Sequence, residues 1–294
     1  MHKSRTRMGC TAFVAVALAV LGLAGSASAK LVGEFTKFQQ CPWTNAEAKK
    51  CLYSLTEGGK VILGNKEVPI VKPVTLQGAF GKPVERISPF IEATNKVTLS
   101  KTSEEVPGGL LGIVPPAGSS PLVKALSKFF FDNALTGVNA TLELAKPASE
   151  IKISELNLAE EAEVALKLPV MVHLENPFLG KSCFVGSSSS PITLELTSGE
   201  TSPSSPNSPI SGKAGAFEFL EEGRVLQLSG NELVDNKWSA PAASGCGGIL
   251  GFLVNPIINA QLGTTTKGHN TAILKNTIDI ATAAAVKKNN EEHP

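Results

Sequence analysis

Short runs in which apolar and polar side chains alternate recur along most of this 294-residue chain. A period of two residues places alternate side chains on opposite faces of an extended strand, so each run can bury one face. Gly, Pro, Asn and Ser separate the runs, as is typical of β-rich proteins. We therefore expect strands at residues 60–63, 68–71, 96–100, 140–144, 170–174, 192–196, 216–220 and 224–228.

The last two of these runs form the clearest local unit. They are separated only by Glu221-Glu222-Gly223, in which Gly223 can adopt the positive φ of a tight turn. This spacing predicts a β-hairpin. Taken together, the runs predict a mainly β fold, either a β-sandwich or a distorted barrel of about ten short strands with two or three short helices.

A capping-box pattern lies beside the first two cysteines after the N-terminal segment. Thr44 is followed three residues later by Glu47, a spacing that often begins a helix. It predicts a short helix at residues 45–51. The alternative is an irregular loop that a disulfide closes.

Two further segments have apolar residues at helical spacing. The first covers residues 120–135, in which Pro121 occupies a favourable first-turn position. The second covers residues 248–262, which are largely apolar. We expect a helix in each, with Pro256 kinking or ending the second. Residues 198–209 are rich in Ser and Pro and predict an extended loop.

The N-terminal segment has the three parts of a secretory signal. Basic residues lie within positions 3–7, an apolar run covers residues 10–23, and Ala27-Ser28-Ala29 supplies small residues. We expect a signal peptide at residues 1–29, cleaved between Ala29 and Lys30. The apolar run is shorter than the roughly 20 residues that span a bilayer. The mature chain is therefore expected to be secreted, extracellular or in the cell envelope, without a transmembrane anchor.

Cleavage changes the charge balance. It removes three of the 27 Lys and Arg residues and no acidic residue, which leaves 24 cations against 26 Asp and Glu. Only Arg86 and Arg224 of those cations are arginine, the residue that best reads phosphates and base edges. Nucleic acid is therefore not an expected partner.

Four cysteines remain after cleavage, namely Cys41, Cys51, Cys183 and Cys246. An even number in an oxidising compartment predicts two disulfides. Three pairings are possible. We favour Cys41 with Cys51 and Cys183 with Cys246, because each pair lies within a stretch of similar composition.

The histidines provide few candidates for a metal ligand or for the base of a catalytic triad. The mature chain has only His173, His269 and His293, and neither a C-x-x-C pair nor a G-x-S-x-G motif occurs. Strand alternation places His173 opposite the apolar residues of the run at 170–174, so it is expected to face solvent. We expect no metal and no cofactor.

Carboxylates and aromatic residues do not form an evident site either. Glu160, Glu161 and Glu163 are too close in sequence to straddle a sugar, so they predict a solvated turn. Trp43 and Tyr53 flank the small cysteine loop and are expected to pack against its disulfide. The mature chain holds few flat aromatic faces for sugar binding, and we expect that it is not an enzyme.

Two glycine-rich apolar segments, residues 106–114 and 247–254, remain without an assigned role. They could pack in the core or cover an open end of the β-structure. Alternatively, they could line an apolar ligand cavity or touch lipid, because small residues leave room for a guest.

Several stretches have a familiar pattern, namely Cys41-Pro42, residues 68–70, residues 75–78, residues 168–183 with Asn-Pro-Phe-Leu-Gly, residues 201–212, residues 233–236 and residues 244–248. Together they resemble a family of exported proteins of unknown function from high-GC Gram-positive bacteria. The resemblance covers most of the mature chain and implies a secreted protein. It assigns a role to no residue.

The sequence thus predicts one secreted, disulfide-containing β domain at residues 30–286 and a disordered tail at residues 287–294. The expected function is non-catalytic, through binding or structural interaction in the secreted medium or the cell envelope. The alternatives are an extracellular carrier of lipid or another apolar ligand, and an unrecognised secreted hydrolase.

Overall fold

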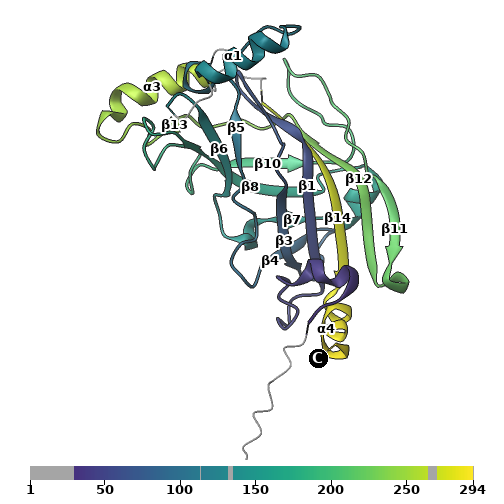
Figure 1. Ribbon diagram of the computed structural model, residues 1–294. Helices are drawn as coiled ribbons and strands as arrows, with labels where there is room; N and C mark the ends of the chain where they lie inside the picture. The colour runs from purple at the N-terminus through teal and green to yellow at the C-terminus, as the bar shows by residue number, and fades with distance from the viewer. Residues whose placement is uncertain (1–29, 113, 132–134, 264–269, 294) are drawn as a thin grey trace, which may run out of the picture.

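The computed structural model describes residues 30–112, 114–131, 135–263 and 270–293. The expected signal peptide and His269 lie outside these residues. The described chain is mainly β, as predicted, and forms one antiparallel sheet of 14 strands that is not closed into a barrel (Figure 1). The strands are β1 (Lys50–Leu63), β2 (Lys66–Pro69), β3 (Val74–Phe80), β4 (Ser88–Glu92), β5 (Ser103–Val106), β6 (Val138–Leu144), β7 (Lys152–Ile153), β8 (Leu166–Glu175), β9 (Phe184–Val185), β10 (Ile192–Leu196), β11 (Ala216–Leu220), β12 (Val225–Asp235), β13 (Ala243–Ser244) and β14 (Thr271–Thr282).

The sheet folds into two limbs. The strand order is β11-β12-β14-β1-β3-β4-β7-β8-β6-β5, with β2 added to β1, β9 and β10 added to β8, and β13 paired with β9. Strand β4 joins the limbs, because Gly78 of β3 pairs with Glu92 and Ser88 pairs with Ile153 of β7. The inner faces of both limbs contribute to one apolar core, which contains Leu52 and Ile278 from one limb and Val170 from the other.

Strand β1 is long and irregular at one point. Its pairing with β14 shifts between Thr56 and Gly58, where the ladder contains a bulge. The adjacent Gly59 has φ of 104°, and a Cβ there would clash with the carbonyl oxygen of Ile273. Only glycine fits this position without strain.

Helices lie at both ends of the folded sheet. They are α1 (Pro121–Phe131), α2 (Glu155–Glu160), α3 (Gly251–Leu262) and α4 (Ala283–Glu292), with short 3-10 turns that include η1 (Gly33–Phe38), η2 (Gly109–Leu111) and η5 (Gly248–Leu250). Figure 1 shows α1 and α3 at one end and α4 at the other. Among the described residues, no helix combines the length and apolar character needed to cross a membrane.

Several local predictions are confirmed. The hairpin is β11 and β12, in which Ala216 pairs with Ser229 and Leu220 with Val225. The two apolar helical patterns correspond to α1 and α3, although Pro256 lies inside α3 and does not end it. Strand β10 has the predicted bounds. The described strands outnumber the expected ten, because the predicted runs include none of β3, β4, β5, β7, β9, β13 and β14.

The strand predicted at residues 96–100 is wrong. The chain turns there: Lys96 has φ of 63°, and the backbone N–H of Val97 donates to Asn95 Oδ1 at 2.9 Å. Only an isolated bridge between Leu99 and Leu76 remains. The side-chain acceptor of an Asn favours a turn at this position over the strand ladder.

The helix predicted at residues 45–51 is also wrong. Asn45 Oδ1 accepts the backbone N–H of Glu47 at 2.9 Å, which makes a turn. Cys51 already belongs to β1 and pairs with both Ala281 and Ala79. The irregular disulfide-closed loop, stated as the alternative, is the observed structure.

The predicted tail at residues 287–294 is wrong for the described part, because α4 extends to Glu292. Thr282 caps the helix by accepting the N–H of Ala285, and Val286 is fully buried. Asn289 Oδ1 accepts the N–H of Val32 at 3.0 Å. The tail is ordered by contacts with the opposite end of the chain, which a local reading of its polar composition cannot reveal.

Candidate functional site

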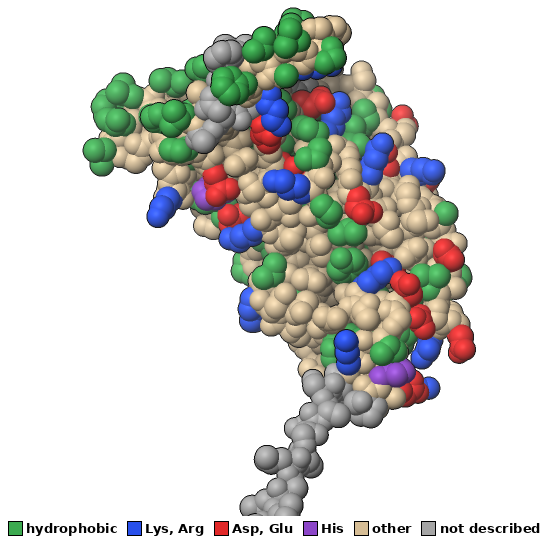
Figure 2. Space-filling model, in the orientation of Figure 1, with side chains coloured by type: hydrophobic (Ala, Val, Ile, Leu, Met, Phe, Trp, Pro, Cys, Tyr) green, Lys and Arg blue, Asp and Glu red, His purple; other side chains and the backbone are tan. Residues whose placement is uncertain are grey.

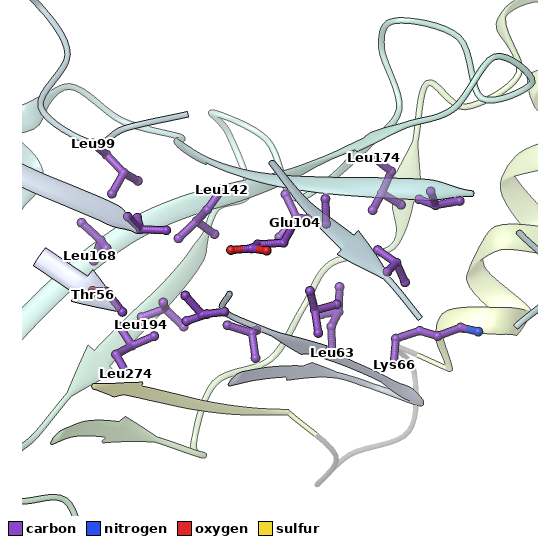
Figure 3. A pocket seen from close by; sticks show the side chains of 18 of the residues that line it. Thr56, Leu63, Lys66, Leu99, Glu104, Leu142, Leu168, Leu174, Leu194 and Leu274 are labelled. Carbon is purple, nitrogen blue, oxygen red and sulfur yellow. The ribbon is translucent and has the colours of Figure 1, made fainter. Parts of the chain in front are cut away.

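The two limbs enclose an apolar cavity of about 160 Å³. Its walls are mainly aliphatic side chains that come from both limbs and from α3, and Figure 3 shows a subset of them pointing inward around an open space. The principal lining residues are Val61, Leu63, Val68, Val74, Leu76, Val106, Leu110, Val138, Leu142, Leu168, Val172, Leu174, Leu194, Leu233, Ile258, Leu262 and Leu274. A cavity of this size with a mainly aliphatic lining can bind an apolar guest.

The cavity has a closed end and a less buried end. Leu168, Leu194 and Thr56 are buried at one side of the view in Figure 3. At the other side lies Lys66, which is half-buried like Leu110 and Gln261. We call the Lys66 side the open end.

A carboxylate lies in the middle of this apolar space. Glu104 is on β5, is 6 % exposed and points into the cavity (Figure 3). Its Oε1 accepts the backbone N–H groups of Val71 at 3.0 Å and Lys72 at 2.7 Å. Its Oε2 is buried and has no hydrogen-bond partner within the described structure. A buried acceptor without a donor is costly, so this oxygen calls for a donor from a guest or from water.

Few other polar groups line the cavity. Thr56 donates to Asn276 Oδ1, and Asn276 Nδ2 donates to the Leu274 carbonyl at 3.1 Å, so these groups largely satisfy one another. The indole Nε1 of Trp238 is buried and, within the described structure, has no acceptor. The site therefore combines one unpaired buried acceptor and one unpaired buried donor, among the described residues, with a mainly apolar wall.

The open end is formed by three segments that are distant in sequence. A Cβ on Gly112, the residue that ends η2, would lie 2.3 Å from Lys66 Nζ and 2.8 Å from Gln261 Oε1. Gly112 has φ of 66°, so glycine permits both the turn and this close approach. Burial lowers the pKa of the Lys66 ammonium.

The glycine-rich segments both lie beside the cavity. From residues 106–114, Val106, Gly109 and Leu110 line it directly. From residues 247–254, Val254 packs against the same core, and the next turns of α3 contribute Ile258. The hypothesis of an apolar cavity behind these segments thus matches the observed geometry.

The cysteines lie in the favoured pairs. Cys183–Cys246 lies at the open end, where the backbone N–H of Gly247 also donates to the carbonyl of the cavity residue Leu179 at 2.7 Å. This disulfide holds the start of α3 against the β8–β9 connection. Cys41–Cys51 lies in a second apolar cluster, against which both Trp43 and Tyr53 pack.

His173 is on the face of β8 opposite the cavity, but the prediction that it faces solvent is wrong. Its ring stacks on that of Phe184, its cross-strand neighbour on the paired strand β9, with ring centroids 4.4 Å apart. Its Nδ1 lies 3.4 Å from Glu143 Oε1, and its Nε2 is buried without a partner. In the described chain no serine, threonine or cysteine hydrogen-bonds to His173, so no nucleophile joins it.

The other residues considered from sequence are not brought together. Glu160, Glu161 and Glu163 are exposed, and Glu160 pairs with Arg86 while Glu161 accepts the N–H of Ala214. His293 lies at the end of α4, far along the fold from His173. Within the described residues, no group of three His, Cys, Asp or Glu side chains could hold a metal ion.

Comparison with protein-family models, with curated proteins and with solved structures finds no match to this chain.

Proposed function

We propose that this protein binds an apolar ligand, such as the hydrocarbon portion of a lipid, in the cavity between its limbs. The observation that carries the proposal is an aliphatic wall contributed by strands of both limbs and by α3. Each methylene group moved from water into such a site contributes about 0.8 kcal/mol. With the expected export signal and the two disulfides, this makes the protein an extracellular carrier rather than an enzyme.

Glu104 narrows the ligand class. A carboxylate accepts hydrogen bonds and repels other anions, so its Oε2 suits a guest with a hydroxyl or amine group and disfavours a carboxylate. The preferred ligand is thus a hydrocarbon chain that carries a hydrogen-bond donor. A hydrogen bond to a charged acceptor contributes about 1.5–3 kcal/mol, enough to set this preference.

Probe binding tests the cavity itself. The mature chain, residues 30–294, is titrated with N-phenyl-1-naphthylamine, and 1-dodecanol is used to displace the probe. Ala140→Trp fills the cavity, whereas Asn139→Trp puts the same side chain on the exposed face of β6. We expect binding by the wild type and by Asn139→Trp, and loss of binding in Ala140→Trp.

Two results would contradict the cavity proposal. One is equal probe binding by a folded Ala140→Trp protein, checked by circular dichroism. The other is failure of the wild type to bind the probe and, in native mass spectrometry, to bind 1-dodecanol. The second result decides the question even if Ala140→Trp does not fold.

A matched ligand pair tests Glu104. The wild type should bind 1-dodecanol about tenfold or more tightly than 2-dodecanone, because the ketone has no donor. Glu104→Gln keeps an oxygen for the Val71 and Lys72 N–H groups and replaces the second oxygen with a donor. It should therefore favour the ketone more than the wild type does. An unchanged preference would exclude Glu104 as the ligand contact while leaving the apolar cavity intact.

A further inference from the structure

Large apolar side chains are exposed on the two helices at the open end. They are Leu122, Val123 and Leu126 of α1, Ile249 of η5, and Phe252 and Leu253 of α3, and their exposed fractions lie between 45 % and 96 %. We call these six residues the apolar rim. Figure 2 shows hydrophobic side chains gathered over α1 and α3. A patch of this kind on one part of a surface marks an interaction site.

Helix α1 is oriented with its apolar face outward. Leu122 and Leu126 are four residues apart and share a face, and Lys124 and Lys128 lie on the opposite face. Lys128 remains at the surface beside α1: its side chain is 68 % exposed, and its Nζ lies 3.1 Å from Glu105 Oε2 on β5. A helix whose apolar face packed on the core would have the reverse orientation.

Helix α3 has apolar residues on both of its faces. Ile258 and Leu262 are buried, while Phe252 and Leu253 are exposed on the outside. Its sequence, GFLVNPIINAQL, contains no charged residue. A helix that is apolar all round is normally buried on every side, so the outer face of α3 requires a covering surface.

The apolar rim adjoins the cavity. Leu110 of η2, which α1 contacts, and Ile258 of α3 both line the cavity, so the apolar rim lies beside its open end. A surface that covers the apolar rim would therefore lie directly against the route into the site.

We propose that the apolar rim docks on an anionic lipid bilayer. Between residues 107 and 131 the only charged side chains are Lys124 and Lys128, and residues 245–263 have none. The exposed Lys181 adds a cation beside Gly248, because a Cβ on its neighbour Gly180 would lie 3.8 Å from Gly248 N.

Apolar side chains flanked by lysines are typical of segments that lie in the interface of anionic membranes. A second copy of the chain would instead bring these lysines together. Docking in this way would place the open end of the cavity at the source of an apolar ligand.

Vesicle sedimentation tests the proposal with the mature chain. Vesicles of phosphatidylglycerol and phosphatidylcholine should bind the wild type more strongly than phosphatidylcholine alone, and added salt should weaken the binding. Leu122→Asp with Phe252→Asp should lower the bound fraction at least about tenfold. Phe219→Asp is the matched control, because Phe219 is 69 % exposed on β11, away from the apolar rim.

The outcomes separate docking from ligand binding. The Asp variants should remain folded and keep their affinity for N-phenyl-1-naphthylamine, because the altered side chains do not line the cavity. Absence of vesicle binding by the wild type, or equal losses in Phe219→Asp, would overturn the proposal. So would a dimer in analytical ultracentrifugation that Leu122→Asp with Phe252→Asp dissociates, since the apolar rim would then bind a second copy.

Discussion

The two ends of this protein use short helices in opposite ways. At one end, which we call the stapled end, η1, the Cys41–Cys51 disulfide and α4 pack around a closed apolar cluster that includes Phe35 and Val286. At the open end, α1 and α3 leave apolar side chains exposed. Both ends belong to the same sheet. The exposed apolar side chains are therefore a local property of the open end and do not reflect loose packing of the whole fold.

Charge placement shows the same difference. In α4, Lys287 pairs with Glu291 and Lys288 with Glu292 on the exposed side, while Val286 faces inward. This is the usual arrangement of a helix that covers a core. In α3 no charge marks an outer face. This difference supports the proposal that the open end contacts another apolar phase.

The largest expected effect comes from a matched pair of Phe→Ala substitutions, one at each end. Phe35 is fully buried and Phe252 is 74 % exposed. Phe35→Ala should lower the free energy of unfolding by about 3–5 kcal/mol, and Phe252→Ala by less than about 0.5 kcal/mol. Urea unfolding measures both. Similar losses would show that α3 is packed rather than exposed in solution.

The Cys183–Cys246 disulfide provides the next test, because it holds the open end together. Its cysteines are 63 residues apart. Replacing both by Ser should lower the free energy of unfolding by about 4 kcal/mol in the chain-entropy model. Reversible unfolding without reductant gives this value, with the Cys41 and Cys51 double variant expected to lose about 3 kcal/mol. A smaller loss at Cys183 than at Cys41 would reverse the expected order.

A smaller effect is expected from the cap of α4. Thr282→Ala removes the side-chain oxygen that accepts the Ala285 N–H, and should lower the free energy of unfolding by about 1 kcal/mol. Thr282→Ser retains the acceptor and should stay near the wild type. Amide hydrogen exchange in α4 should increase in the Ala variant only. Equal exchange in both variants would instead favour the predicted disordered tail over an ordered α4.

The smallest effect concerns Lys37, whose Nζ lies 3.0 Å from the buried Asp279 Oδ1 at the stapled end. Burial lowers the pKa of Lys37, but hydrogen bonds to Glu34 and Asp279 outweigh it and the pKa is raised. The stabilisation is therefore fully present below the ordinary lysine pKa and is lost as pH rises through the raised one. Lys37→Met should cost up to about 1 kcal/mol at neutral pH. Its difference from the wild type should shrink above about pH 10.5. A constant difference would assign the loss to packing.

Sequence patterns predicted the elements whose structure depends mainly on residues close to one another in the sequence. Alternation identified β10 and β11, and helical spacing identified α1. Strand β14 was not predicted, because Asn276 and Asp279 interrupt its apolar pattern. Both are buried, and two of their partners, Thr56 and Lys37, are more than 200 residues away.

The candidate site could be predicted from the sequence only in outline. The glycine-rich apolar segments suggested a cavity, but its lining comes from strands spread over most of the chain. Glu104 and Glu105 are adjacent and look alike in sequence. Which of the two turns inward depends on the pairing of β5 with β6, where Glu104 lies opposite Ala140 and faces the cavity with it. The tertiary fold therefore determines which of the two carboxylates faces the cavity.

The central claim is that the space between the limbs holds an apolar ligand with a donor at Glu104. A crystal structure of the mature chain soaked with 1-dodecanol tests it most directly. We predict continuous density for the alkyl chain among Leu142, Leu168 and Leu194, with the hydroxyl within hydrogen-bond distance of Glu104 Oε2. A cavity filled by ordered water, or closed by the surrounding side chains, at a ligand concentration that saturates probe displacement would contradict the claim.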